Sequence, residues 1–213
     1  MRKTPDRILP WLARIAWVLT APFVRYEIRG GRCVPNLHVA VVVCNHRSMF
    51  DVVAGLIGLH HFRRYPRLLI AREYVEGRWT GPFARAIGAI PVDRASNGGA
   101  SFKAAVAALR SGVPVLIMPE GRLHWDPTKP GKLGPAHSGV SRLAVAAEVV
   151  VIAAGLSGTE RVWPASACLP RFNPLRRKRV IINVANTPLV LHGEDHQANT
   201  ERVMDAIRSL LVL

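Results

Sequence analysis

The sequence predicts an α/β fold, a single domain with a largely parallel sheet and helices on both faces. Apolar, β-branched runs alternate with helical patterns along the chain, which is typical of strands joined by helical crossovers. Several of these runs are continuously apolar, as expected of strands that are covered on both faces. The 213 residues, 49% of them hydrophobic, are enough to form one core.

The expected elements follow in order along the chain. Short apolar runs predict strands at 39–44, 67–71, 88–93, 113–118, 149–156 and 179–184. Helical patterns predict helices at 8–22, 50–60, 79–87, 99–111, 138–147 and 197–212. In the helix at 99–111, Phe102, Val106 and Leu109 recur at helical spacing, and Gly112 follows as a stop signal. Ligands of such sheets bind beyond the carboxyl ends of the strands.

The N-terminal segment is mostly apolar from residue 8 to residue 24. It contains Trp11 and Trp17, and Arg14 interrupts it. The uninterrupted stretch is too short to span a bilayer. An amphipathic helix that lies in the membrane interface would place the Trp rings at headgroup depth. A helix that packs on the core of the domain is an equally good interpretation.

Basic residues dominate the charge of the chain. Lys and Arg number 29 against 14 acidic residues, so the formal net charge is +15. Such a surface attracts nucleic acid, acidic lipid headgroups or phosphorylated substrates. No zinc-finger, helix-turn-helix or RNA-binding signature is present, so we do not expect nucleic acid as a partner. Three widely spaced cysteines, Cys33, Cys44 and Cys168, argue against a disulfide framework and for a reducing compartment.

A histidine and an aspartate lie five positions apart directly after the first expected strand. The segment Cys44–Asp51 reads CNHRSMFD. The imidazole of His46 can take a proton from a hydroxyl, and the carboxylate of Asp51 can fix its tautomer. The alternative is a capped turn in which Asn45 and Asp51 bond to backbone amides.

Two further strands end in charged residues. The run 88–94 ends on Asp93 and Arg94, and a guanidinium there can bind a phosphate through two hydrogen bonds. The run 113–122 ends on Glu120, Gly121 and Arg122. Glu120 can accept hydrogen bonds from substrate hydroxyls or hold the two arginines, and Gly121 permits a close approach of the backbone to a ligand. A surface ion pair and a turn with solvated charges are the alternatives.

The order and spacing of these three blocks resemble the glycerolipid acyltransferase family, the 1-acylglycerol-3-phosphate O-acyltransferases in particular. The resemblance extends from about residue 26 to residue 190. It implies that His46 is the base and Asp51 its partner, and that the acceptor is bound by Arg94, Glu120, Gly121 and Arg122. Two departures are visible: no Thr separates Gly121 from Arg122, and residues 150–154 lack a proline.

The resemblance implies an O-acyltransferase of phospholipid biosynthesis. Its acyl donor would be acyl-CoA or acyl-carrier protein, and its acceptor would be a hydroxyl of lysophosphatidic acid. No cofactor or metal is expected. Residues 1–24 would form a membrane-interface helix and residues 25–213 the acyltransferase domain. The protein would lie at the cytoplasmic face of the membrane, peripheral or monotopic, against an anionic surface. The alternatives are another lysophospholipid, a glycolipid or a polyol as acceptor, a thioesterase, and a non-catalytic basic membrane-binding module.

Overall fold

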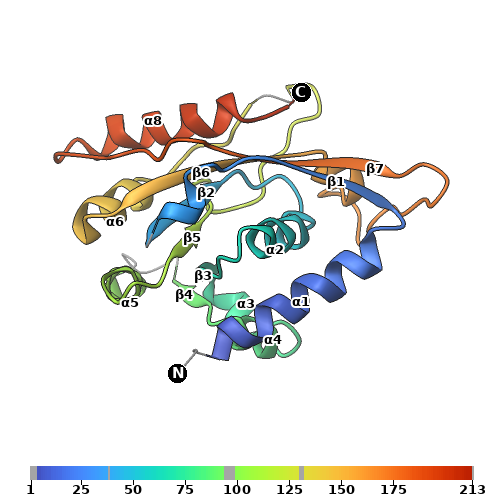
Figure 1. Ribbon diagram of the computed structural model, residues 1–213, viewed down its shortest axis with the longest axis horizontal. Coiled ribbons are helices and arrows are strands. Elements are labelled where there is room, and N and C mark those ends of the chain that lie inside the picture. Colours follow the sequence, from blue (N-terminus) through green and yellow to red (C-terminus); the bar gives the residue numbers. More distant parts are fainter. Residues whose placement is uncertain (1–3, 38, 94–98, 130–131, 213) are drawn as a thin grey trace.

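A seven-stranded sheet forms the centre of the molecule (Figure 1). The computed structural model describes residues 4–37, 39–93, 99–129 and 132–212. The strand order across the sheet is β1-β7-β6-β2-β5-β3-β4. The strands are β1 (Val24–Gly30), β2 (Ala40–Cys44), β3 (Arg67–Ala71), β4 (Ile90–Val92), β5 (Val115–Ile117), β6 (Val150–Ser157) and β7 (Lys178–Val184).

Helices cover both faces of the sheet. They are α1 (Thr4–Thr20), η1 (Val34–Asn36, a 3₁₀ turn), α2 (Asp51–His61), α3 (Arg72–Glu76), α4 (Gly81–Ala86), α5 (Gly99–Arg110), α6 (Gly139–Ala147), α7 (Thr159–Val162) and α8 (His196–Ser209). Figure 1 shows α8 on one side of the sheet and α1 and α2 on the other. The predicted α/β class is therefore confirmed.

Strand β2 illustrates how one apolar run serves both faces. Val41 and Val43 point into the cluster that includes residues of α5, α6 and α8. Ala40 and Cys44 point to the opposite side, into the cluster that contains Ala54 of α2. Because successive side chains of a strand alternate between faces, a strand buried on both sides must be apolar throughout.

Strand direction brings several loops to one edge of the sheet. The pairs β2–β5, β2–β6, β3–β5 and β3–β4 are parallel. The pair β6–β7 is antiparallel, and β1 is parallel to β7. The carboxyl ends of β2, β3, β4, β5 and β6 therefore meet at the same edge. The sheet is largely parallel, as predicted, with one reversal of direction at β7.

Helix α1 packs on the domain with one face only. Leu9 and Ala13 are each 1% exposed and pack with Leu56 of α2. Trp11 and Leu19 are 64% and 65% exposed. The buried face agrees with the core-packing interpretation, and the membrane-interface interpretation stays a prediction for the exposed apolar face. Within the described residues, no helix has both the length and the apolar content needed to cross a membrane.

Candidate active site

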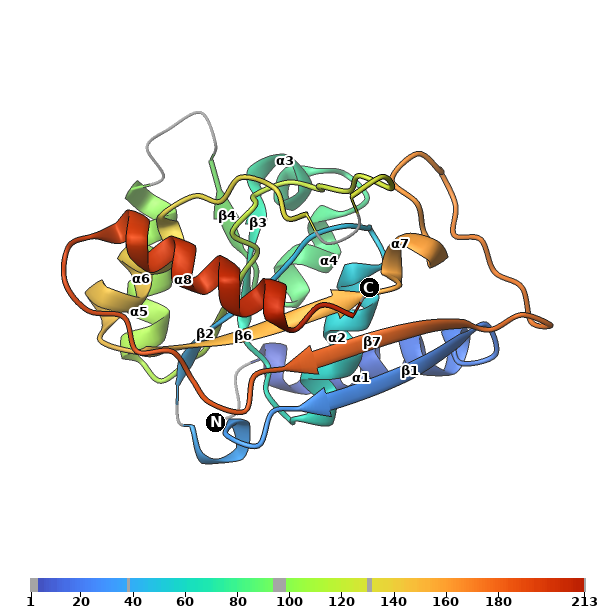
Figure 2. The same cartoon turned by 90° about the horizontal axis from the view of Figure 1, so that it is seen from above.

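The predicted catalytic loop follows β2, which lies between β6 and β5 in the sheet. Figure 2 shows the loop after β5, the start of α2 and helix α7 at the same end of the molecule. The side chain of Asn45 fixes the end of β2 to its neighbour. Its Nδ2 donates to the Leu156 carbonyl at 2.9 Å, and its Oδ1 accepts from the Leu156 N–H at 2.8 Å. The loop that carries His46 thus begins from a rigid point.

His46 and Asp51 are in direct contact. The His46 Nδ1 lies 3.0 Å from Asp51 Oδ2, and the same oxygen accepts the backbone N–H groups of Arg47 at 2.6 Å and Ser48 at 2.8 Å. Asp51 is fully buried, whereas the His46 side chain is 19% exposed. Since a carboxylate only accepts, Nδ1 carries the proton of the neutral ring, and Nε2 carries the lone pair that can receive a proton. The sequence left two alternatives, a capped turn and a base-carboxylate pair. Both are present, because the same carboxylate bonds to the loop amides and to His46.

The hydroxyl of Ser48 makes structural hydrogen bonds and is not placed as a nucleophile. Its Oγ donates to the Trp163 carbonyl at 2.6 Å and accepts from the Phe50 N–H at 3.0 Å. No base activates this hydroxyl in these contacts, as a covalent serine mechanism would require.

Glu120 supports the catalytic loop from the neighbouring strand. The side chain is 2% exposed. Its Oε1 accepts the His46 N–H at 2.9 Å, and its Oε2 accepts the Gly134 N–H at 2.7 Å. The His46 carbonyl in turn accepts the N–H of His124 at 2.8 Å. Glu120 thus positions the backbone of the base, and its predicted contact with the acceptor stays a prediction.

The remaining predicted acceptor residues divide into two groups. Gly121 and Arg122 follow Glu120 on an exposed turn, and the φ of +65° at Gly121 favours glycine. Arg94 follows β4 and lies outside the described residues. The structure therefore brings His46, Asp51 and Glu120 together and leaves the contact of both arginines with an acceptor as a prediction.

Arg47 is a residue that the sequence did not single out. It is 2% exposed, and its guanidinium lies 5.1 Å from the centre of the Trp125 ring. Burial lowers the pKa of Arg47, and the nearby carboxylates of Glu160, Glu120 and Asp51 oppose that shift. An arginine in a polar loop is normally solvated, so the sequence carries no signal of this burial.

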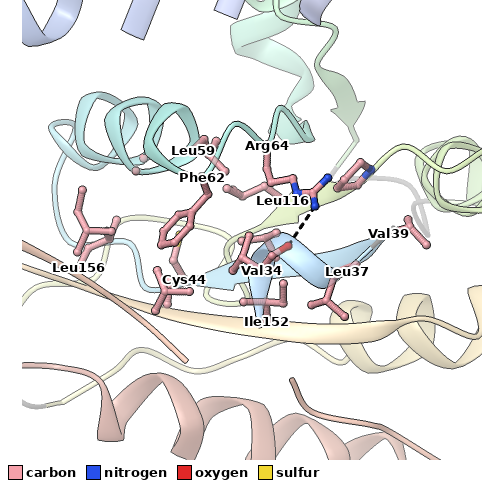
Figure 3. Close-up of a pocket in the computed structure, with 18 residues that line it drawn as sticks. Val34, Leu37, Val39, Cys44, Leu59, Phe62, Arg64, Leu116, Ile152 and Leu156 are labelled. Carbon is pink, nitrogen blue, oxygen red and sulfur yellow. Dashed lines mark hydrogen bonds between the residues drawn. The ribbon is translucent and has the colours of Figure 1, made fainter. Parts of the chain in front are cut away.

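An apolar pocket lies between α2 and the sheet (Figure 3). Cys44 and Leu156 line one end, and Leu37 and Val39 line the other. A Cβ at Gly55 of α2 would meet no atom within 4 Å, so this helix leaves open space above the strands. Because Cys44 precedes His46 by two positions, the pocket begins beside the catalytic loop. Its lining residues look like ordinary core residues in the sequence, so the pocket could not be predicted.

The described residues contain no cluster of three or more His, Cys, Asp or Glu side chains placed to hold a metal ion.

Comparison with known proteins decides the family. A model of the acyltransferase family matches residues 25–157. The chain belongs to this acyltransferase family. The matched segment starts in β1 and contains His46, Asp51, Glu120 and Gly121, whereas Glu160 and Trp163 lie beyond it.

This acyltransferase is similar to one curated protein and to one solved structure. It is 32% identical over 109 residues to 1-acyl-sn-glycerol-3-phosphate acyltransferase of Bacillus subtilis (strain 168). The alignment covers 50% of this chain and 54% of the relative, so the chain matches about half the length of that curated protein. The crystal structure of the 1-acyl-sn-glycerophosphate (LPA) acyltransferase, PlsC, from Thermotoga maritima has a TM-score of 0.70 at 18% identity. The match covers 96% of this acyltransferase and 79% of that chain and shows a common fold.

Proposed function

We propose that this acyltransferase moves an acyl group from the thioester of acyl-CoA or acyl-carrier protein to a hydroxyl of lysophosphatidic acid. One observation carries the proposal: the His46–Asp51 pair stands beside the end of an apolar pocket. A base that faces a hydroxyl and a site for a hydrocarbon chain are the two parts that such a transfer needs. The name of the relative from Bacillus subtilis supports this choice of acceptor.

The reaction requires no covalent enzyme intermediate. Nε2 of His46 accepts the proton of the acceptor hydroxyl as the hydroxyl oxygen attacks the thioester carbonyl carbon. The tetrahedral intermediate collapses, the C–S bond breaks, and the thiolate takes the proton back from the imidazolium. Asp51 stabilises that imidazolium and holds the ring in the required tautomer. Base and carboxylate are thus regenerated in each turnover.

The acyl chain would occupy the pocket beneath α2. The lining is almost wholly apolar, with Leu59 and Phe62 on the helix side and Leu116 and Ile152 on the sheet side (Figure 3). Transfer of a hydrocarbon chain from water into such a lining is favourable, at about 0.8 kcal/mol per buried CH₂ group. The chain would enter past Cys44, which brings the thioester carbonyl to His46.

The phosphate of the acceptor would be bound on the other side of the base. Arg122 is exposed on the turn after β5, and Arg94 follows β4, at the far edge of the sheet. Guanidinium groups bind phosphate through paired, charge-assisted hydrogen bonds. The formal charge of +15 would also draw an anionic substrate to the surface.

We place the protein peripherally at the cytoplasmic face of an anionic membrane. Two exposed apolar groups support this location. One is the outer face of α1, where Trp11 and Leu19 lie. The other is the loop between α7 and β7, where Leu169 and Leu175 are 74% and 93% exposed. The arginines in this loop, Arg171, Arg176 and Arg177, complement an anionic surface.

One contact joins these two apolar groups. Phe172 of the loop stacks on Phe23, directly after the turn that ends α1, with ring centres 4.7 Å apart. The same ring meets Phe50 of the catalytic loop edge-on at 6.4 Å. A membrane bound at these surfaces would therefore lie close to the base, and a lipid substrate would have a short path into the site.

The experiment is a product assay with two donors and several acceptors. Purified protein is incubated with acyl-CoA or acyl-carrier protein and with lysophosphatidic acid, other lysophospholipids, a glycolipid or glycerol, and products are identified by mass spectrometry. We expect phosphatidic acid, and none with His46→Ala. A product from another acceptor would reassign the substrate, release of free fatty acid alone would indicate a thioesterase, and no reaction would favour a membrane-binding module.

A further inference from the structure

A polar pocket of about 280 Å³ lies beside the catalytic loop, apart from the apolar pocket under α2. Arg47 of the catalytic loop, Trp125 of the loop after β5 and Glu160 of α7 line it. Arg161 and Arg179 also contribute to the lining, and Arg179 is held by two hydrogen bonds to Glu27. Among the described residues, the lining includes neither the predicted base His46 nor Glu120, Gly121 and Arg122 of the predicted acceptor site.

Two buried side chains that line this pocket each carry polar atoms without a hydrogen-bond partner. Arg47 is 2% exposed, and its Nε and Nη2 have no partner. Glu160 is 7% exposed, and its Oε2 has none. The two groups therefore do not satisfy each other through these atoms, although opposite charges would favour it. Buried polar atoms are nearly always satisfied, so a donor and an acceptor left open in one pocket indicate that a ligand completes them.

The charges around the pocket define the ligand. Arg47 is near the carboxylates of Glu160, Glu120 and Asp51. The other two arginines of the lining have acidic partners, Arg179 in Glu27 and Arg161 in Glu160, whose Oε1 lies 3.9 Å from Arg161 Nε. An anion bound at Arg47 would be repelled by these carboxylates, and a cation bound at Glu160 would be repelled by Arg47. A neutral group that accepts from a guanidinium and donates to a carboxylate meets both demands. An amide, with one C=O and one N–H, is such a group.

The sheet places this pocket on the donor side of the base. His46 follows β2, its neighbour β6 leads to Glu160, and Arg179 lies in β7, on the far side of β6. The proposed phosphate-binding arginines follow β5 and β4 on the other side of β2. With the acceptor on that side, the thiol portion of the donor must leave the base toward β6 and β7. In both candidate donors this portion is a pantetheine arm, which contains two amides.

We propose that Arg47 and Glu160 bind an amide of the pantetheine arm of the acyl donor. Arg47 donates to the amide carbonyl, Glu160 accepts the amide N–H, and Trp125 holds the guanidinium plane against its ring. The inference rests on the proposed function in one respect, that the donor is a pantetheine thioester. Since CoA and carrier protein carry the same arm, this pocket would accept either donor.

The test compares two donors within each enzyme variant. S-acyl-pantetheine and the thioester of the same acid with ethanethiol differ by the arm alone. Their ratio of kcat/KM is independent of the fraction of active protein. We expect Arg47→Met to reduce this ratio about 10- to 100-fold, as loss of a hydrogen bond to a charged group would, and Glu160→Gln to reduce it less. Arg110→Met removes an exposed charge at the end of α5, outside the pocket, and should leave the ratio unchanged.

A binding measurement keeps the inference separate from the proposed function. Free pantetheine is titrated into wild type, Arg47→Met and Glu160→Gln, and the fluorescence of Trp125 is followed, with Trp125→Phe to assign the signal. If pantetheine binding depends on Arg47 but the protein does not acylate lysophosphatidic acid, the inference is supported. Only lysophosphatidic acid as the acceptor is then rejected. An unchanged donor ratio, or equal pantetheine binding by wild type and both variants, would overturn the inference and make Arg47 and Glu160 structural charges.

Discussion

One oxygen of Asp51 serves the fold and the chemistry together. Oδ2 accepts from the ring of His46 and from two backbone N–H groups of the catalytic loop. Asp51 is also the first residue of α2, where the helix dipole favours a negative charge. The carboxylate is thus held by the loop that it orients.

This shared oxygen leads to the first prediction. His46→Ala should lower kcat by about 10²–10⁴-fold, the range of general-base catalysis, without unfolding the protein. Asp51→Asn should also be severe, because the neutral amide lacks the charge with which the carboxylate stabilises the imidazolium that forms on His46. Steady-state kinetics and circular dichroism of both variants provide the check. Near-wild-type turnover by His46→Ala would contradict the mechanism.

Glu120 provides a second prediction. In Glu120→Gln, one of the two backbone N–H groups that the carboxylate now accepts loses its partner. We expect a loss of about 1–3 kcal/mol in the free energy of unfolding, measured by urea denaturation, and a lower kcat because His46 is less well held. The KM values for donor and acceptor should change little. A rise in the acceptor KM alone would instead make Glu120 an acceptor ligand.

The cysteines provide a third prediction. Burial raises the pKa of Cys44, and Asp51 and Glu120 add to this rise by repelling a thiolate. Cys168 is exposed. Since the thiolate is the reactive form, a thiol reagent at pH 8 should modify Cys168 quickly and Cys44 only after unfolding. Peptide mass spectrometry of native and denatured samples measures both rates, and fast native labelling of Cys44 would disprove its burial.

At the scale of elements, the paired strands and main helices could be predicted from hydrophobic pattern. The run 67–71 corresponds to β3 without a shift, and most other predicted elements differ from the observed ones by a few residues. Strand β1 was not among the strands that the hydrophobic pattern predicts. Its charged residues alternate with half-buried ones along an edge of the sheet, and the signal of a continuous apolar run is absent there.

Other features could not be read from a pattern because they depend on contacts between distant residues. The reversal at β7 is invisible to periodicity, which is the same for parallel and antiparallel strands. The His46–Asp51 pair was predictable because its members are five positions apart. The contact of Glu120 with the backbone of His46 spans 74 positions, and the burial of Arg47 needs Trp125 in place.

The fourth prediction concerns the contact between β1 and β7. Hydrogen bonds from Arg179 and Arg29 lower the pKa of Glu27 from 4.5 to about 2. A lowered pKa in the folded state means that the carboxylate contributes stability above pH 4.5 and loses this contribution as the pH falls toward 2. Glu27→Gln should therefore lower the melting temperature at pH 7 and have almost no effect at pH 2.

The measurement is the thermal unfolding of wild type and of Glu27→Gln at several pH values from 7 to 2. Because Glu27 is on the surface, salt should reduce the difference between the two proteins. A melting-temperature difference that stays constant from pH 7 to pH 2 would show that the carboxylate charge is not the cause.

At the scale of the whole molecule, the exposed apolar side chains of α1 and of the loop before β7 support binding to a membrane. The fifth prediction is that Leu19→Asp and Leu175→Asp each reduce binding to anionic vesicles. Neither should lower the melting temperature, because both side chains are largely exposed. Co-sedimentation at low and high salt measures the binding, and its electrostatic part should weaken with salt.

Deletion of the N-terminal segment is the contrasting experiment. Leu9 and Ala13 pack against the domain, so a chain without residues 1–24 should expose Leu56 and lose stability. The point variants therefore test the membrane surface more cleanly than a truncation. Wild-type vesicle binding by both Asp variants would reject these two surfaces as the membrane contact.

The pairing of β1 with β7 has a consequence for folding during synthesis on the ribosome. Of the strands in the sheet, β1 is synthesised first, and β7, to which it hydrogen-bonds, is synthesised last. Until β7 has been synthesised, β1 has no strand of the sheet to pair with. Such late, long-range pairing slows folding and leaves the nascent chain prone to aggregation.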